Sequence, residues 1–310
     1  MRWIWFGVLC MPLLLQAQPP SVTSGRMISW LAFPSKHIQS PDIDIWLPNG
    51  YADSIRYAVV YMQDGQMLFD SSITWNHQSW EVDETANGLL VQGVIRPCIF
   101  VGISSKPETR YRYFFPEDPF WQLNKRQRDT VVARLVRSGR AQRGFEPGSN
   151  EFLIFMVEEL RPAINRSFSV DTNRAATFCA GSSMGAMLSC YALCKYPQVF
   201  GGAACFSTHW VGVVQQDGNP FPRAILCYLK HHLPAAGNHH WYFDCGTKTL
   251  DSLYPSIQHR VDRILKKKGY AAANWVTQYA DGDDHSEKAW RRRLPAALRF
   301  LLGNKPNGGP

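Results

Sequence analysis

The sequence predicts an α/β fold in which a mostly parallel central sheet carries helices on both faces. Short apolar segments of strand length alternate with segments of helical periodicity along most of the chain. Two strand segments, 57–62 (YAVVYM) and 98–103 (CIFVGI), are apolar at successive positions, as strands covered on both sides are. The segments within 26–58 alternate between apolar and polar residues, which is typical of antiparallel edge strands.

The remaining elements continue this alternation. Further strands are expected at 175–180, 200–207, 239–244 and 275–279. Helices are expected at 80–92, 151–164 (capped by Ser149 and Asn150), 186–195 and 256–268, with a closing helix that ends at Leu302.

Residues 104–148 are too long for an ordinary connection, and such an insert is usually a functional segment or a lid. It contains a basic, periodic piece at 122–136 and a group of aromatic side chains. The aromatic residues are Tyr111, Tyr113, Phe114, Phe115, Phe120 and Trp121. Two interpretations remain open, because these rings could line one wall of a pocket or pack together in a surface excursion.

Composition favours one large globular domain, expected at 18–302. Apolar residues make up 45% of the chain and charged residues 19%, so a sizeable core can be buried. The net charge of +8 is scattered, and its densest runs, 266–268 and 291–293, fall on expected surface helices. No nucleic-acid-binding motif accompanies them, so we expect no nucleic-acid partner.

The first seventeen residues resemble a secretory signal peptide. Arg2 precedes the apolar run 3–15, and Gln16-Ala17 precede a polar exit. We therefore expect cleavage after Ala17 and export to the periplasm or the medium, with lipidation at Cys10 as a minor alternative. The run is too short for a comfortable membrane span, and residues 303–310 are expected to form a disordered tail.

Cysteines and acidic clusters give no metal site. Seven of the eight cysteines remain after removal of the signal peptide, and most are interpreted as small core residues. An odd number in an exported protein leaves at least one thiol free or bridged to another molecule. Cys190 and Cys194 lack a second ligand pair, and the cluster Asp281, Asp283 and Asp284 lacks the spacing of a calcium loop.

Residues 181–185 read Gly-Ser-Ser-Met-Gly between an expected strand and an expected helix. In this context a Gly-x-Ser-x-Gly turn raises Ser183 above the sheet as a candidate nucleophile. The same turn places the backbone N–H of Met184 at a helix N-terminus, where it can stabilise an oxyanion. The alternative is an ordinary strand-to-helix turn.

A second glycine turn, Gln63-Asp64-Gly65-Gln66, follows the central strand 57–62. Open α/β sheets bind ligands at the carboxyl ends of their strands. We expect this turn to supply the second oxyanion N–H from the backbone of Gln66, or failing that of Gly65. An ordinary turn is the alternative.

A serine nucleophile needs a base, and the base needs a carboxylate. Asp251 and His285 follow Ser183 in the chain order of α/β hydrolases, each after an expected strand. Asp244 is the alternative acid. His209 and Trp210, after another strand, are candidate pocket residues, although they could equally be structural loop residues.

Several motifs together resemble the putative-esterase (esterase D-like) family of α/β hydrolases, across roughly residues 27–302. They are YMQDGQMLFD, TWNHQSWEVDET, GSSMGAMLSCYALCKYPQVFGGAACFSTHW, YFDCGTKTLD and DHSEKAWRRRL. That family includes feruloyl, acetylxylan and siderophore esterases, S-formylglutathione hydrolases and mycolyltransferases. The resemblance implies the α/β-hydrolase fold, with Ser183 as nucleophile, His285 as base, Asp251 as acid and the Met184 and Gln66 amides as oxyanion hole.

Two positions depart from the family pattern. Ala186 replaces the final glycine of the nucleophile motif, where a methyl group inside a helix is tolerated. Gln63 stands where relatives often have histidine, and we expect it to change the polarity of the pocket.

These features predict an exported serine esterase that needs no cofactor and acts on a carbohydrate or siderophore ester. Acyl transfer to a sugar or lipid hydroxyl by the same triad is an alternative. A non-catalytic carbohydrate-binding protein with the same fold is another. Oligomeric state and the identity of the ester are not readable from the sequence.

Overall fold

The computed structural model describes residues 19–214 and 217–304. The expected signal peptide lies outside this part of the chain, as do residues 305–310 of the expected tail. Gly303 and Asn304, which we expected to be disordered, are instead held beside the segment before β4. Gly303 bridges Ile95, and the amide of Asn304 donates to the carbonyl of Val94 over 3.2 Å.

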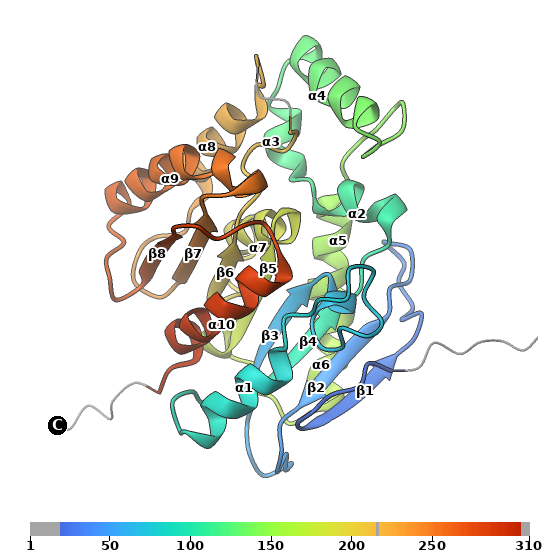
Figure 1. Cartoon of the computed structure of the whole chain (residues 1–310), viewed down its shortest axis with the longest axis vertical. Helices are drawn as coiled ribbons and strands as arrows, with labels where there is room; N and C mark the ends of the chain where they lie inside the picture. Colours follow the sequence, from blue (N-terminus) through green and yellow to red (C-terminus); the bar gives the residue numbers. More distant parts are fainter. Residues whose placement is uncertain (1–18, 215–216, 305–310) are drawn as a thin grey trace, which may run out of the picture.

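One eight-stranded sheet organises the fold, with the strand order β1-β2-β4-β3-β5-β6-β7-β8 (Figure 1). The strands are β1 Arg26–Trp30, β2 Ile43–Leu47, β3 Ala58–Gln63, β4 Cys98–Ile103, β5 Thr177–Ser182, β6 Gly202–Phe206, β7 His240–Gly246 and β8 Trp275–Ala280. β1 and β2 pair antiparallel and β2 pairs antiparallel with β4, while all later pairings are parallel. The predicted edge strands and mostly parallel sheet are therefore confirmed.

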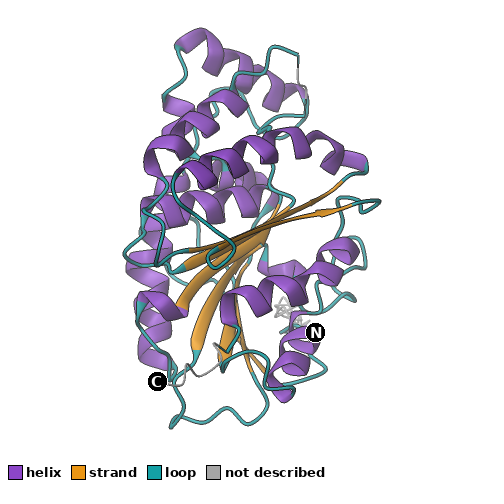
Figure 2. Ribbon diagram, turned by 90° about the vertical axis from the view of Figure 1, so that its left-hand side faces the viewer, coloured by secondary structure: helices purple, strands orange, loops and turns teal. Residues whose placement is uncertain are grey.

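Helices cover both faces of this sheet (Figure 2). They are α1 Val82–Val91, α2 Pro107–Phe114, α3 Glu117–Trp121, α4 Lys125–Arg137, α5 Ser149–Ile154, α6 Arg161–Ser167, α7 Met184–Lys195, α8 Phe221–His232, α9 Pro255–Lys267 and α10 Glu287–Leu302. β3 shows why both layers form, because its side chains alternate between two cores. Val59 and Tyr61 pack into the core with α5 to α9, and Val60 and Met62 pack into the core with α1 and α10.

The helix expected at 151–164 is continuous but not regular. It begins at Ser149, which we expected in the cap, and changes to a π-helical segment at Phe155–Leu160 before α6. Pro162 lies in the first turn of α6. Because proline has no N–H to donate, a shift in the hydrogen-bond ladder is expected at this position.

The insert at 104–148 folds into α2, α3 and α4, which lie beyond the sheet in Figure 1. Most of its aromatic side chains pack among themselves and against the core, as the second interpretation predicted. Tyr113, Phe114, Phe115 and Phe120 are buried there. Tyr111 alone of the named set lines the central cavity described below. Trp121 is 44% exposed and lies on a separate groove beside α4.

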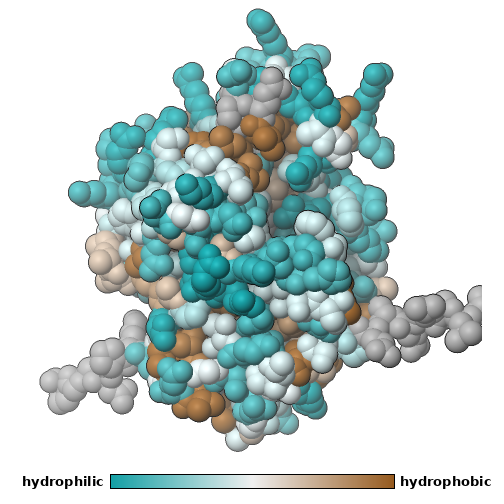
Figure 3. All heavy atoms as spheres, viewed as in Figure 1, coloured by the Kyte–Doolittle hydropathy of each residue, from teal (hydrophilic) through white to brown (hydrophobic). Residues whose placement is uncertain are grey.

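The surface seen in Figure 3 is mostly hydrophilic, with smaller apolar patches. Within the described chain, no helix combines the length and the apolar character that crossing a bilayer requires. All seven described cysteines carry free thiols, and six of them are buried, as expected of core residues.

Candidate active site

Ser183 lies at a sharp turn between β5 and α7. Its φ of 55° is in the left-handed region, which is strained for a residue with a side chain. The turn is held from two sides, because the Ser183 amide donates to the Phe206 carbonyl (2.9 Å) and the His209 amide donates to the Ser183 carbonyl (3.1 Å). Gly181 is required here, since a Cβ atom would approach the Gln63 side chain and the Gly185 backbone to 2.9 Å. The sequence thus folds into the nucleophile turn that its glycines predicted.

Two backbone amides near this turn have no backbone acceptor among the described residues. One is Met184, the first residue of α7, and the other is Gln66, in the short 3₁₀ turn Gly65–Met67 after β3. Gly65 allows the turn to pack on β4, because a Cβ atom there would lie 2.6 Å from the backbone of Gly102. Free amides at these positions are donors suited to an oxyanion.

His285 and Asp251 form the second part of the site. The Nδ1 atom of His285 lies 2.5 Å from the Oδ1 atom of Asp251, a fully buried carboxylate. The other oxygen, Oδ2, accepts hydrogen bonds of 2.6 Å from the Ser207 hydroxyl and from the Gly246 amide. The backbone of His285 is fixed as well, by a 3.0 Å hydrogen bond to Thr249 Oγ1. This arrangement fixes the ring of His285 and leaves its Nε2 atom free of Asp251.

Asp244, the alternative acid, is paired with Arg293 of α10. Its Oδ1 atom accepts a 3.1 Å hydrogen bond from Arg293 Nη2, and its Oδ2 atom lies at ion-pair distance, 3.1 Å, from Arg293 Nε. Burial raises the pKa of Asp244, and the Arg293 guanidinium opposes this rise. Of the two aspartates that the sequence left open, Asp251 is therefore the one that contacts the histidine.

Ser207 connects α10 to this carboxylate. Its φ of 45° is again left-handed, and its hydroxyl donates to Asp251. The same hydroxyl accepts from Trp290 Nε1 (2.9 Å) and from Arg293 Nη2 (3.0 Å). A cation and an indole N–H thus reach Asp251 through one buried hydroxyl. Sequence reasoning missed Ser207, although its position at the end of β6 was a usable signal.

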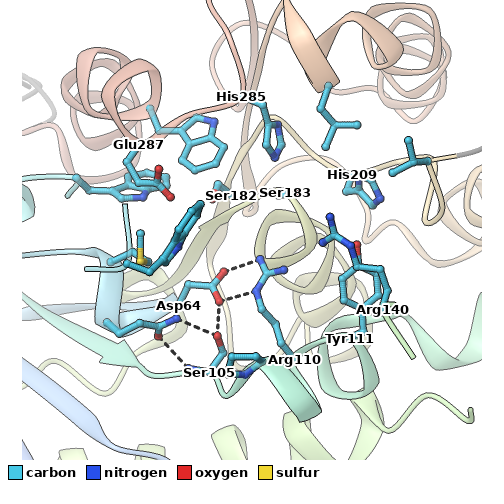
Figure 4. A pocket seen from close by; sticks show the side chains of 18 of the residues that line it. Asp64, Ser105, Arg110, Tyr111, Arg140, Ser182, Ser183, His209, His285 and Glu287 are labelled. Carbon is cyan, nitrogen blue, oxygen red and sulfur yellow. Dashed lines mark hydrogen bonds and ion pairs between the residues drawn. The ribbon is translucent and has the colours of Figure 1, made fainter. Parts of the chain in front are cut away.

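A cavity of about 450 Å³ lies over these groups at the carboxyl ends of the strands (Figure 4). Ser183 and His285 both line it, as do Gln66 and His209. Its aromatic lining residues are Trp75, Trp80, Tyr111 and Trp290. The structure therefore brings the predicted nucleophile, the predicted base and one predicted oxyanion residue to one cavity.

Two predicted pocket residues lie elsewhere. Gln63 is 1% exposed and points under the turn, where its Oε1 atom accepts from Ser189 Oγ over 2.7 Å. Trp210 is fully buried, and its indole N–H donates to Gln258 Oε1 over 2.8 Å. Neither lines the cavity, so this prediction was wrong. Both side chains are needed to satisfy buried polar groups in the layer below the site.

His209 lies on the cavity and is almost completely buried. Its Nδ1 atom is 2.7 Å from the hydroxyl of Tyr254. Burial lowers the pKa of His209 to about 3, and the charges of His285, Arg140 and Arg110 act in the same direction. His209 is therefore a neutral imidazole near Ser183.

The wall below Gln66 contains an ion pair that the sequence did not reveal. Asp64 binds Arg110 of α2 in a bidentate manner, with contacts of 2.7 and 2.8 Å. Ser105 donates to Asp64 over 2.5 Å, and its amide donates to Gln66 Oε1 over 3.0 Å. This network holds the 3₁₀ turn that carries the Gln66 amide. The Asp-Gly pair was a visible signal for Asp64, but Arg110 comes from the insert, where no motif marks it.

Among the described residues, no group of three histidine, cysteine, aspartate or glutamate side chains is arranged to hold a metal ion. The functional groups of the site are instead a hydroxyl, an imidazole, a buried carboxylate and free backbone amides. Such a set supports nucleophilic attack on a carbonyl and stabilisation of the resulting oxyanion.

Residues 38–301, which contain all of these groups, match the sequence model of a family described as "Putative esterase". The chain belongs to this putative esterase family. It is accordingly a carboxylic-ester hydrolase, with the α/β-hydrolase fold that the sequence predicted.

One sequence relative and several solved structures are similar to most of this chain. An uncharacterized protein of Bacillus subtilis (strain 168), YbbA, is 26% identical over 267 residues, which cover 84% of this esterase and 91% of YbbA. A ferulic acid esterase structure has a TM-score of 0.63 at 14% identity and covers 89% of this chain and 98% of its own. The enterobactin esterase of Shigella flexneri, in the presence of enterobactin, has a TM-score of 0.62 at 18% identity. That match covers 91% of this chain but 60% of the Shigella chain.

Proposed function

We propose that this chain is an exported serine esterase that hydrolyses a carboxylic ester through Ser183, His285 and Asp251. The observation that carries the proposal is the shared cavity. Ser183, on its strained turn, lines the same 450 Å³ space as His285, whose ring is fixed by the buried Asp251. This is the combination of nucleophile, base and orienting acid that acyl transfer needs.

In the proposed reaction, the Ser183 oxygen attacks the ester carbonyl while its proton passes to Nε2 of His285. The Met184 and Gln66 amides donate to the oxyanion that forms. Collapse of this intermediate breaks the bond to the alkoxy group, which leaves as an alcohol with the proton from His285. A water molecule then attacks the acyl-enzyme, with His285 again as base, and releases the acid. Asp251 keeps His285 in the tautomer that makes Nε2 the acceptor.

A carbohydrate or siderophore ester is the proposed substrate class. It is supported by the structural neighbours, which include a ferulic acid esterase and an enterobactin esterase. The exposed Trp75 supports it too, because this indole is 83% exposed at the cavity rim and offers a flat face to a ring. Export is supported by the signal-like pattern of residues 1–17. Appearance of a chain that starts at Gln18 outside the cytoplasm would test it.

The test of the proposed chemistry is the Ser183→Ala variant, assayed with short-chain 4-nitrophenyl esters. We expect turnover to fall by at least about 10⁴-fold, because the attacking atom is removed. A fluorophosphonate probe should label the wild type at Ser183 and leave the variant unlabelled. Ser167→Ala, an exposed serine at the end of α6, is the matched control and should keep full activity. Unchanged turnover in a correctly folded Ser183→Ala variant would contradict the proposal.

A further inference from the structure

Arg140 places a positive charge without a counterion on the wall of the cavity. It follows α4 and lines the same cavity as Ser183, with its guanidinium carbon 5.2 Å from the centre of the Tyr111 ring. Its amide donates to the Leu135 carbonyl over 2.8 Å, which anchors the backbone. Among the described residues, no carboxylate lies within ion-pair distance of this guanidinium. The other arginine of the cavity, Arg110, is neutralised by Asp64.

His209 adds an unused polar atom on the same side. Its Nε2 atom is buried and has no hydrogen-bond partner, although the residue lines the cavity. We assign the proton of the neutral ring to Nε2, because the Tyr254 hydroxyl can then donate to Nδ1 of His209 over 2.7 Å. His209 then presents an N–H donor. Its neighbour in Figure 4 is Arg140, whose charge also contributes to the lowered pKa of this histidine.

The acidic groups of the cavity are placed so that they do not cancel Arg140. Glu287 lies on the other side of the cavity in Figure 4 and accepts from Asn76 Nδ2 over 2.8 Å. Asp64 is already paired with Arg110, and Asp251 is paired with His285. The side formed by Arg140, Tyr111 and His209 is therefore the positive side of the cavity. An anionic group would be attracted there and repelled by Glu287 on the other.

We infer that the ester substrate carries a carboxylate, which Arg140 and the Nε2–H of His209 bind on this side of the cavity. The inference rests on the proposed function, since it names a substrate class for the same site. Guanidinium is the side chain best suited to a carboxylate, because its N–H donors match both oxygens. A cation–π contact with Tyr111, 5.2 Å from the guanidinium carbon to the ring centre, helps to keep the guanidinium at the wall. Arg140 is thus a specificity-determining residue, and its loss should affect acidic esters more than neutral ones.

Two pairs of esters of matched length test the inference. One pair has the carboxylate on the acyl side, 4-nitrophenyl hemiglutarate against 4-nitrophenyl valerate. The other has it on the alcohol side, 4-carboxyphenyl acetate against phenyl acetate. In Arg140→Gln we expect kcat/KM for the acidic member of at least one pair to fall about tenfold relative to the neutral member, the size of one charged hydrogen bond. Arg140→Lys should retain part of the preference.

Arg137→Gln is the matched control, because it removes the same charge from the exposed last residue of α4, outside the cavity lining. Its ratio of acidic to neutral turnover should equal that of the wild type. If Arg140→Gln and Arg137→Gln give the same ratio for both pairs, the inference is overturned while the proposed function stands. If Ser183→Ala still hydrolyses the neutral esters, the proposed function itself fails. The two failures are therefore distinguishable.

Discussion

The two sides of the cavity are built in different ways. On one side, Asp251 and Asp244 are fully buried, and Ser207 and Arg293 connect them to α10. On the other side, the insert supplies Tyr111, Arg110 and the exposed Arg140, whose charge is unpaired within the described chain. The first side is a closed hydrogen-bond network, and the second is an open wall with unused donors.

The difference indicates that the two sides of the cavity serve different purposes. Groups at the ends of β6 and β7 are fixed by the sheet and by α10, so they can keep a histidine in one orientation through each turnover. Arg140, in the insert, is not tied into such a network and can change with the substrate, whereas Arg110 is held by Asp64. Chemistry should therefore be sensitive to changes on the buried side, and substrate preference to changes in the insert. The next three predictions test this contrast, from the largest expected effect to the smallest.

Asp251→Asn should have the largest effect. An asparagine whose oxygen accepts from Ser207 and Gly246 turns its NH₂ group toward His285, so Nδ1 must accept and the ring takes the wrong tautomer. We expect kcat to fall by about 10³–10⁴-fold with the fold intact, as for the aspartate of other triads. Steady-state kinetics and circular dichroism measure this, with the exposed Asp129→Asn as control. A loss below tenfold would contradict the assigned role.

Arg293→Met should come next, as a loss of stability. The variant leaves Asp244 as a buried carboxylate without its cation, which costs about 3–5 kcal/mol of unfolding free energy. Urea unfolding measures the change. Arg140→Gln, which removes the exposed arginine of the same cavity, should change stability by less than about 0.5 kcal/mol. An equal loss of unfolding free energy in the two variants would contradict the proposed difference between the two sides.

His209 should give the smallest effect, as a dependence of stability on pH. Its pKa is lowered to about 3 in the folded protein, against about 6.5 in the unfolded chain. Between these values the unfolded chain binds a proton that the folded protein does not, so stability falls as the pH is lowered. From pH 6.5 to 5 this amounts to about 2 kcal/mol. Urea unfolding at both pH values measures this. The unfolding free energy of His209→Gln should fall by about 2 kcal/mol less than that of the wild type. Equal falls in both proteins would show that His209 is not held neutral.

Much of the architecture was predictable because it depends on local pattern. Strand lengths, the two-sided burial of β3 and the Gly-x-Ser-x-Gly turn all follow from neighbouring residues. The chain order of Ser183, Asp251 and His285 was also readable, because each follows a strand of a parallel sheet. Ser183 and His285 line one cavity, with Asp251 beneath His285, because the sheet topology brings these strand ends together.

The pocket walls were not predictable to the same degree. Gln63 ends a strand, and whether it faces the cavity or the layer below depends on the alternation of β3. Trp210 comes soon after Ser207, whose left-handed backbone conformation could not be predicted from the residue type. The Trp210 amide then donates to the Thr208 carbonyl over 2.7 Å, which tightens the turn. Arg110 and Arg140 come from an insert with ordinary helical periodicity. Their roles depend on long-range contacts that a single sequence does not encode in any motif.

The link from Ser207 to Trp290 and Arg293 has a consequence for the order of maturation. The Ser207 hydroxyl, which donates to Asp251, is itself held by Trp290 and Arg293 of the 16-residue helix α10. A chain still emerging from the ribosome has β5 and its serine long before it has this helix. We therefore expect the nascent enzyme to remain inert until α10 has been made and has docked against Ser207.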